Sequence, residues 1–391
     1  MNLADNTPTP AAPTPRLRAM PLAAWTVFAV ALLLYVFDLG TDFTFDSRSQ
    51  ILVDDYVHAP RHVWDILSLR VLGMDVLDRN RPLVLLSFMA DSAVWGRLAM
   101  GYHLTSALLH AGCAVLVFLL AVGLLADEGT GRPRWMPSGA GTLAAFLPAL
   151  WFAVHPVQVE AVAQVSFRED LLALFFLLAG LLVARRFPGV TGWRAWGLGA
   201  AGVGLFLLAV GSKETGVAGP PVLAVYGLLF RRGTGRRLHW GVLIAAATAA
   251  VVAFLVISRS AAPETSRILL SAPSYPGGSL ASALRLQPRI LALYLQNIAV
   301  PTRLCADYGG ASICHIPLWL AVGGLVFVAV AAVAVVWHSR VFAVGLCLVV
   351  CGLLPVSNLV PIYMAAADRF LYMPMAGLAV CLAALLSRGF A

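Results

Sequence analysis

Apolar stretches long enough to cross a lipid bilayer recur along almost the whole of this sequence. Residues 101–126, for example, contain no Asp, Glu, Lys or Arg, and a membrane-spanning helix needs about 20 predominantly apolar residues. Hydrophobic residues make up 60% of the 391 residues and charged residues only 12%, whereas soluble domains carry roughly 25% charged residues. The pattern excludes a soluble enzyme, a disordered chain and a nucleic-acid-binding module. It predicts an all-α polytopic membrane protein that lies in the lipid bilayer.

About ten segments are predicted to span the bilayer. They are 20–40, 101–126, 139–155, 169–184, 195–211, 216–230, 240–257, 317–337, 341–355 and 372–387. Residues 283–300 are long enough but contain Arg, Gln and Asn side chains, so we expect an interfacial or loop-packed helix there. Residues 1–18 are Pro- and Thr-rich and are predicted to form a disordered cytoplasmic tail. Residues 19–391 are then a single transmembrane domain.

Arginines and acidic residues fall on opposite sides of this helix map. The short segments assigned to the cytoplasm are rich in arginine, and of the 19 acidic residues only Asp5, Asp127 and Glu128 fall on that side. The positive-inside rule therefore places both termini in the cytoplasm. The two long loops, about 41–100 and 258–317, lie on the outer face, and the first is rich enough in Trp, Leu and Val to be folded.

Carboxylates in the first outer loop are candidates for chemistry. Asp46 is flanked by Phe43 and Phe45, which are expected to form an apolar wall and to increase its basicity. Asp54 and Asp55 follow a few residues later. A carboxylate held at a membrane interface can act as a general base or a metal ligand. The alternative is a solvated polar loop.

Basic residues near the outer helix ends are candidates for binding an anion. They are Arg81, Arg168, Lys213 and Arg369. Lys213 is the only lysine of the chain, which suggests that arginine would not serve at its position. Glu160 is expected to hold Arg168 in a buried ion pair, and Glu214 to pair with Lys213. The alternatives are interfacial anchors and ion pairs that only hold helices together.

Histidines and cysteines give less information about a functional site. His103 and His155 lie near outer helix ends, and Tyr372 begins the final span. Cys305 and Cys314 are nine residues apart in the second outer loop, a spacing that permits a disulfide in an oxidising compartment. The four remaining cysteines fall in spans and are expected to be buried thiols. No Cys/His spacing is typical of zinc.

The order of these motifs resembles that of one family. FDxxxxI, RPLxxxSF, GYHLxxALLH, HPVxxEAVxxVxxRxDLLA, KETG, LCADY, PVSNLxP and DRFLYMP follow one another between about residues 40 and 380. The series is similar to the membrane region of the transmembrane and tetratricopeptide-repeat-containing O-mannosyltransferases and their bacterial relatives.

The resemblance implies a C-type glycosyltransferase fold. Such enzymes take sugar from a polyprenyl- or dolichyl-phosphate carrier on the outer side of the membrane, and members of this family transfer mannose to Ser or Thr hydroxyls. The essential acid of the fold lies in the first outer loop, at Asp46 by motif position. Carboxylates there serve with or without a divalent metal. The implied location is a bacterial inner membrane, with the active site on the periplasmic face.

The sequence departs from the family in two places. Ser47 follows Asp46 where the family usually has a second acid, so Asp54 or Asp55 would substitute if that second acid is the essential one. Tetratricopeptide repeats are not found between Met1 and Ala391. Acceptor recognition by repeats is therefore not expected from this segment.

The expected function is sugar transfer from a polyprenyl-phosphate donor to a hydroxyl of a protein or glycan. The four basic residues would stabilise the leaving phosphate, and Asp46 would take the acceptor proton in a direct displacement that inverts the anomeric carbon. Supporting roles fall to His103, His155, Glu160, Glu214 and Tyr372. A transporter or flippase for lipid-linked substrates is the first alternative, although inverted repeats and midplane charges are not evident. A non-catalytic membrane scaffold is the second.

Overall fold

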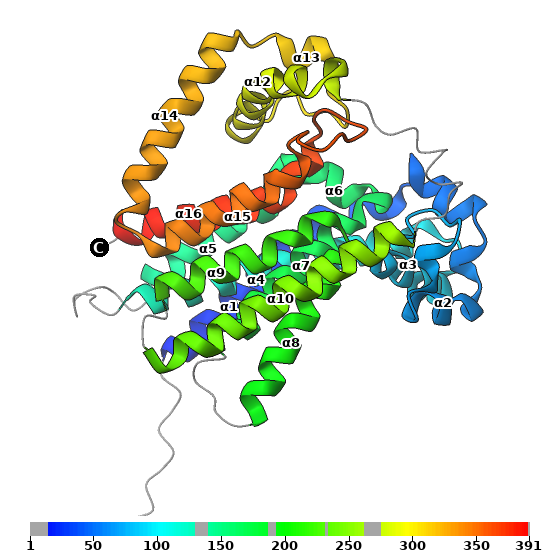
Figure 1. Ribbon diagram of the computed structural model, residues 1–391, viewed down its shortest axis with the longest axis horizontal. Coiled ribbons are helices and arrows are strands. Elements are labelled where there is room, and N and C mark those ends of the chain that lie inside the picture. Colours follow the sequence, from blue (N-terminus) through cyan, green and yellow to red (C-terminus); the bar gives the residue numbers. More distant parts are fainter. Residues whose placement is uncertain (1–14, 130–139, 187–192, 231–233, 262–274, 390–391) are drawn as a thin grey trace, which may run out of the picture.

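The computed structural model describes residues 15–129, 140–186, 193–230, 234–261 and 275–389 (Figure 1). Within these ranges all regular secondary structure is helical. Most of the predicted tail, residues 1–14, lies outside them. The helix α1 begins at Pro15, four residues before the predicted start of the transmembrane domain.

Each of the ten apolar segments contains a helix. These are α1 (Pro15–Leu34), α4 (Ala99–Glu128), α5 (Ala140–Val154), α7 (Arg168–Arg186), α8 (Trp193–Val210), α9 (Gly219–Phe230), α10 (Thr234–Ser260), α14 (Leu318–Val336), α15 (Arg340–Leu353) and α16 (Tyr372–Gly389). Shorter helices are α2 (Val63–Leu67), α3 (Pro82–Trp95), α6 (Val159–Ala163), α12 (Leu280–Ala299) and α13 (Gly310–Cys314).

Six helices in the described ranges are long and apolar enough to cross a membrane. They lie at Pro21–Gly40, Ala99–Glu128, Trp193–Val210, Trp240–Ser260, Leu318–Val336 and Asp368–Gly389. A seventh span results if α5 and the segment Pro156–Ala163, which meet at a bend of 52°, count as one. The ten-span prediction is not confirmed, because α9 and α15 are short and α7 begins and ends with charged residues.

The bundle is built around α4, which packs against α1, α5, α7 and α16. The helices α15 and α16 approach each other closely. A Cβ atom on Gly345 would lie 2.8 Å from the carbonyl oxygen of Gly377, and one on Gly377 would lie 2.7 Å from that of Gly345. Only glycine fits at this crossing, which is the way small residues let membrane helices pack closely.

The first long loop is folded, as the sequence predicts. Its own apolar core contains Phe43, Ile51, Val71 and Phe88, and its short helical turns are η1 (Phe37–Gly40), η2 (Arg48–Val53), η3 (Tyr56–His58), η4 (Pro60–His62) and η5 (Arg70–Gly73). The helix α2 ends at Leu67, two residues before Leu69, which adopts a left-handed conformation with φ of 60°.

The second long loop is described in part, since residues 262–274 lie outside the described ranges. Its helix α12, the segment expected to be interfacial, is not among the candidate spans. It packs against α13 and α14 (Figure 1). Cys305 and Cys314 are both free and exposed, so the structure contains no disulfide between them.

Short 3-10 turns connect the helices on the side where the candidate residues lie. They are η6 (Pro156–Gln158), η7 (Val165–Phe167), η9 (Glu214–Ala218), η10 (Pro276–Gly278), η11 (Leu354–Val356) and η12 (Asp368–Leu371). The turns η7, η9 and η12 lead directly into α7, α9 and α16.

Candidate functional site

The candidate residues gather at one end of the bundle, where α8 ends and α7 and α16 begin. Lys213 follows α8, Glu169 and Asp170 lie in the first turn of α7, and Arg369 lies in η12 before α16. A helix N-terminus stabilises acidic side chains in its first turn, which suits the two acids of α7.

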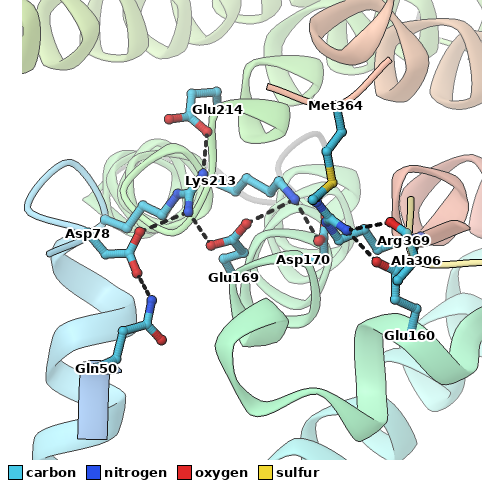
Figure 2. Close-up of polar contacts among 11 residues, drawn as sticks. Gln50, Asp78, Glu160, Glu169, Asp170, Lys213, Glu214, Ala306, Met364 and Arg369 are labelled. Carbon is cyan, nitrogen blue, oxygen red and sulfur yellow. Dashed lines mark hydrogen bonds and ion pairs between the residues drawn. The ribbon is translucent and has the colours of Figure 1, made fainter. Parts of the chain in front are cut away.

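Lys213 lies at the centre of this end. Its Nζ atom is 2.6 Å from Oδ2 of Asp170 and 3.1 Å from Oε1 of Glu169, and all three side chains are nearly buried (Figure 2). The predicted pairing of Lys213 with Glu214 is therefore wrong. Glu214 follows Lys213 in the chain, but η9 turns it away, and its side chain is 53% exposed.

Glu169 connects Lys213 to a second cation. Its other oxygen, Oε2, accepts a hydrogen bond from Nη1 of Arg81. The guanidinium of Arg81 also lies 3.0 Å from Oδ1 of Asp78 and 3.5 Å from Oε2 of Glu214. Asp78, Arg81, Glu169, Asp170, Lys213 and Glu214 are called the bridged cluster below. It joins α3, α7 and η9.

Burial and charge act in opposite directions on the ionisation of the bridged cluster. Burial by itself would lower the pKa of Lys213, but the carboxylates of Asp170 and Glu169 raise it above its usual value, so the ammonium stays charged. Burial raises the pKa of Asp78 to about 6, and Glu169, Glu214 and Asp46 add to the rise while Arg81 opposes it. Asp78 therefore titrates near neutral pH.

A second ion pair lies beside the cluster. Glu160 accepts hydrogen bonds from the guanidinium of Arg369 and, at 2.8 Å, from its backbone N–H. The guanidinium also stacks on the ring of Phe167, 4.0 Å from its centroid. The ring of Phe370 lies near the cations of both ion pairs. Its centroid is 5.1 Å from the guanidinium carbon of Arg369 and 5.9 Å from the Lys213 ammonium.

Arg168 has a different place from the one predicted. It is fully buried, its Nη1 atom lies 2.6 Å from Oδ2 of Asp91, and its Nη2 donates to the carbonyl of Tyr102 at 2.7 Å. Its partner is thus Asp91 on α3, and the predicted pair with Glu160 is wrong. Arg168 fastens α3 and α4 to α7, and the structure does not bring it into the bridged cluster.

The three candidate acids of the first loop, Asp46, Asp54 and Asp55, lie in different surroundings. Asp46 is exposed and lies close enough to Asp78 to affect its ionisation. Asp54 caps a turn by accepting the backbone N–H of Tyr56 at 2.8 Å. Asp55 is exposed and pairs with Arg97. Of the three, only Asp46 lies at the edge of the bridged cluster.

The apolar wall expected around Asp46 is incomplete. Phe43 is buried and packs edge-on against Tyr102. Phe45, in contrast, adopts a left-handed φ of 48° and is 71% exposed. The carboxylate of Asp46 therefore reaches water on one side rather than facing a closed cavity.

An open pocket of about 280 Å³ lies between this loop and α6. Its lining residues are Asp38, Thr41, Asp42, Thr44, Phe45, His103, Val159, Glu160, Ala163, Gln164, Phe167 and Ala306. His103 and Glu160 are therefore placed together, as expected for supporting residues. The pocket also contains Gln164, which the sequence did not single out.

His155 and Tyr372 have structural contacts. The ring of His155 accepts the N–H of Val157 through Nδ1 at 3.2 Å and donates through Nε2 to the carbonyl of Ile298 at 3.0 Å. Tyr372 is fully buried and donates to Nδ1 of His110 at 2.9 Å. Neither residue lines the pocket.

Glu169 and Asp170 hold the cations Arg81 and Lys213, although neither acid is among the site residues predicted from the sequence. The signal was present, because the two acids directly follow Arg168 in the motif. In the described ranges, no three His, Cys, Asp or Glu side chains converge in a way that would hold a metal ion.

Comparison with known proteins finds several protein O-mannosyl-transferases. The chain is 34% identical to the protein O-mannosyl-transferase Tmtc1 of Drosophila melanogaster over 195 residues, which are 48% of this chain and 21% of that protein. It is 32% identical to the human protein O-mannosyl-transferase TMTC4 over 224 residues, 53% of this chain and 29% of that protein. The mouse protein of the same name is 27% identical over 408 residues, 90% of this chain and 54% of that protein.

These alignments cover at most about half the length of the relatives. No family model matches the sequence, and no solved structure matches it.

Proposed function

We propose that this chain, whose curated homologues are TMTC protein O-mannosyl-transferases, is a membrane glycosyltransferase. It moves a hexosyl group, mannose by the names of the relatives, from a polyprenyl-phosphate carrier to a hydroxyl of a protein or glycan. The observation that carries the proposal is the bridged cluster, in which one carboxylate, Glu169, holds Arg81 and Lys213 at one end of a bundle of apolar helices.

A lipid-phosphate donor needs cations at the level where its headgroup meets its apolar tail. Glu169 holds both Arg81 and Lys213, so these two side chains have less conformational freedom than exposed side chains. The contact of Arg81 with Glu214 is its longest, at 3.5 Å, and Glu214 is half-exposed. Of the three carboxylates that contact Arg81, Glu214 would therefore be the one that a phosphate displaces with the smallest loss of free energy. Arg369 would assist from beyond Phe370, since guanidinium groups bind phosphate bidentately.

Asp46 is the base of the proposed reaction. The acceptor hydroxyl attacks the anomeric carbon, the bond from that carbon to the phosphate oxygen breaks, and Asp46 takes the hydroxyl proton. The phosphate leaves with the bonding electrons, and its charge is stabilised by Arg81 and Lys213. A single displacement inverts the anomeric carbon.

The charge pattern supports an N-in, C-in orientation with the active end facing the periplasm of a bacterial inner membrane. The opposite end of the bundle carries Arg185, Arg186, Arg194, Arg340 and Arg388. Positive residues prefer the cytoplasmic side. A reporter fused after Arg388 should be active only in the cytoplasm, and periplasmic activity of that fusion would contradict the orientation.

A transfer assay tests the function. Membranes containing the chain, a radiolabelled polyprenyl-phosphate-mannose and a peptide rich in Ser and Thr should give labelled peptide, and Asp46→Asn should abolish it. Asp55→Asn, in the same loop, is the matched control and should transfer normally. No transfer by the unmodified chain from any polyprenyl-phosphate-hexose would reject the proposal. Uptake of the donor by proteoliposomes without transfer would favour the transporter.

A further inference from the structure

We propose that the open pocket between the first loop and α6 binds the hexopyranosyl group of the donor. This inference rests on the proposed function and assigns a second part of the same donor to its own subsite. The bridged cluster would take the phosphate, and the pocket would take the sugar.

The lining of the pocket suits a neutral polyhydroxyl ligand. Carboxylates of Asp38, Asp42 and Glu160 accept hydrogen bonds from hydroxyl groups, and the hydroxyls of Thr41 and Thr44 both donate and accept. No Lys or Arg side chain is among its lining residues. An anion is therefore disfavoured there, whereas a sugar can satisfy several acceptors at once.

Aromatic side chains supply the other surface that a sugar needs. Phe45 is 71% exposed beside the polar groups, and Phe167 lines the same pocket. A pyranose ring has an apolar face of C–H groups, which loses contact with water when it packs on a ring. The exposed ring of Phe45 is therefore available to pack against the apolar face of a sugar.

The size of the pocket limits the ligand. Its volume of about 280 Å³ is at the lower end of small-molecule sites, which run from roughly 300 to 1,000 Å³. It fits one monosaccharide rather than an oligosaccharide.

His103 adds a polar ring to the wall of the pocket. It lines the pocket and is 5% exposed, and backbone groups of Asp42 and Ala163 lie within hydrogen-bonding reach of the ring. Its Nε2 atom lies 3.3 Å from the hydroxyl of Thr41. A neutral imidazole both donates and accepts hydrogen bonds, so the pocket-facing edge of this ring suits a sugar hydroxyl.

The wall that carries Phe45 is held in place by Gln164. Its amide NH₂ donates to the carbonyl of Thr44 at 2.6 Å, and its carbonyl oxygen accepts from the hydroxyl of Thr44 at 2.5 Å. The first loop is thereby fixed against the turn between α6 and η7. A fixed wall favours selection of one sugar shape over another.

The pocket lies between the two other parts of the proposed site. Phe45 lines it and is followed by Asp46, the proposed base. Glu160 lines it and binds Arg369, a proposed phosphate ligand. A hexosyl group in this place is next to both the group that accepts the proton and the group that receives the phosphate.

Direct binding of methyl α-mannopyranoside tests the inference. The full chain in detergent is titrated with this sugar, and saturation-transfer NMR reports binding. Asp42→Ala and Phe45→Ala change exposed lining residues and should each weaken binding about tenfold or more. Asp55→Ala and Trp64→Ala are the matched controls, because they are exposed in the same loop and do not line the pocket. Inorganic phosphate should not compete, and competition would overturn the assignment.

Transfer kinetics separate this inference from the proposed function. Asp42→Ala should raise KM for the lipid donor and leave KM for the acceptor peptide unchanged. A rise confined to the acceptor KM would overturn the assignment to the donor sugar. Transfer that is insensitive to both Asp42→Ala and Phe45→Ala would reject the pocket while the function stands. Sugar binding without any transfer would support the pocket and reject the function. Thermal unfolding of each variant shows whether it is folded.

Discussion

The bridged cluster and the open pocket lie side by side at one end of the bundle, and their charges are satisfied in opposite ways. In the cluster, Glu169 and Lys213 are 6% exposed and touch opposite charges. In the pocket, Asp42 and Phe45 are exposed and no Lys or Arg is among the lining residues, although the lining residue Glu160 is paired with Arg369. Charges that are buried and paired hold helices and cations in position. Carboxylates that are open to water are available to a ligand.

This difference predicts that substitutions in the cluster lower the stability of the fold as well as transfer, whereas those in the loop lower ligand binding or rate and leave stability unchanged. Removing one partner of a buried pair costs about 3–5 kcal/mol, because the other charge is left uncompensated. An exposed group carries no such penalty. The experiments below follow this contrast.

The largest loss of stability is expected for Lys213→Met. Asp170 would lose the ammonium that it contacts at 2.6 Å, so unfolding should become easier by about 3–5 kcal/mol. Thermal unfolding in detergent measures this loss. The double variant Lys213→Met with Asp170→Asn removes both charges and should recover part of it. Stability equal to the unmodified chain would show that the pair contributes nothing.

The largest loss of transfer without a loss of stability is expected for Asp46→Asn. General-base help is worth typically 10²–10⁴-fold in rate, and the exposed side chain of Asp46 makes no ion pair in the described part of the chain. In Asp46→Asn, the single-turnover rate of transfer should therefore fall while the thermal unfolding midpoint stays unchanged. A change confined to donor affinity would reassign Asp46 to binding, and an unchanged rate would move the base to Asp54 or Asp55.

A smaller effect is expected from the pH dependence of Asp78. Its pKa is raised from 3.8 to about 6 in the folded chain, so folding favours the protonated carboxyl. Its contribution to stability is complete below about pH 4 and is lost as the pH rises through 6, on the order of 1–3 kcal/mol.

The variant Asp78→Asn should remove this pH-dependent loss. Asn tolerates the left-handed φ of 53° at this position, so the turn should survive. Unfolding midpoints measured between about pH 4 and pH 7 test both chains. If the unfolding midpoint of Asp78→Asn depended on pH as steeply as that of the unmodified chain, the titration would belong to another group.

The smallest effect is expected for Arg97→Ala. The ion pair between Arg97 and Asp55 is exposed on both sides, so its loss should cost about 0.2–1 kcal/mol and leave transfer unchanged. A strong loss of transfer would mean that Asp55 has a role in the reaction, and the contrast between Asp46 and Asp55 would fail.

Much of the helical framework could be predicted from sequence, because apolar runs and flanking charges are local properties. All ten apolar segments contain helices, and the first loop is folded. The number of spans could not be predicted as well. Whether α9 and α15 cross the bilayer depends on their length in the folded chain, and residues 216–218 of the predicted span 216–230 belong to the turn η9 rather than to α9.

The sequence by itself determined that this is a helical membrane protein with charged residues gathered at helix ends, since burying an apolar segment in lipid requires only its own composition. The tertiary structure alone decided which charges meet. Glu160 is eight positions before Arg168, yet it binds Arg369, which is 209 positions away. The reason is physical: the extended residue Gln164 and the turn η7 lie between Glu160 and Arg168, so the two residues do not share one helix face. Ion pairing follows the packing of helices around α4, and no local pattern records it.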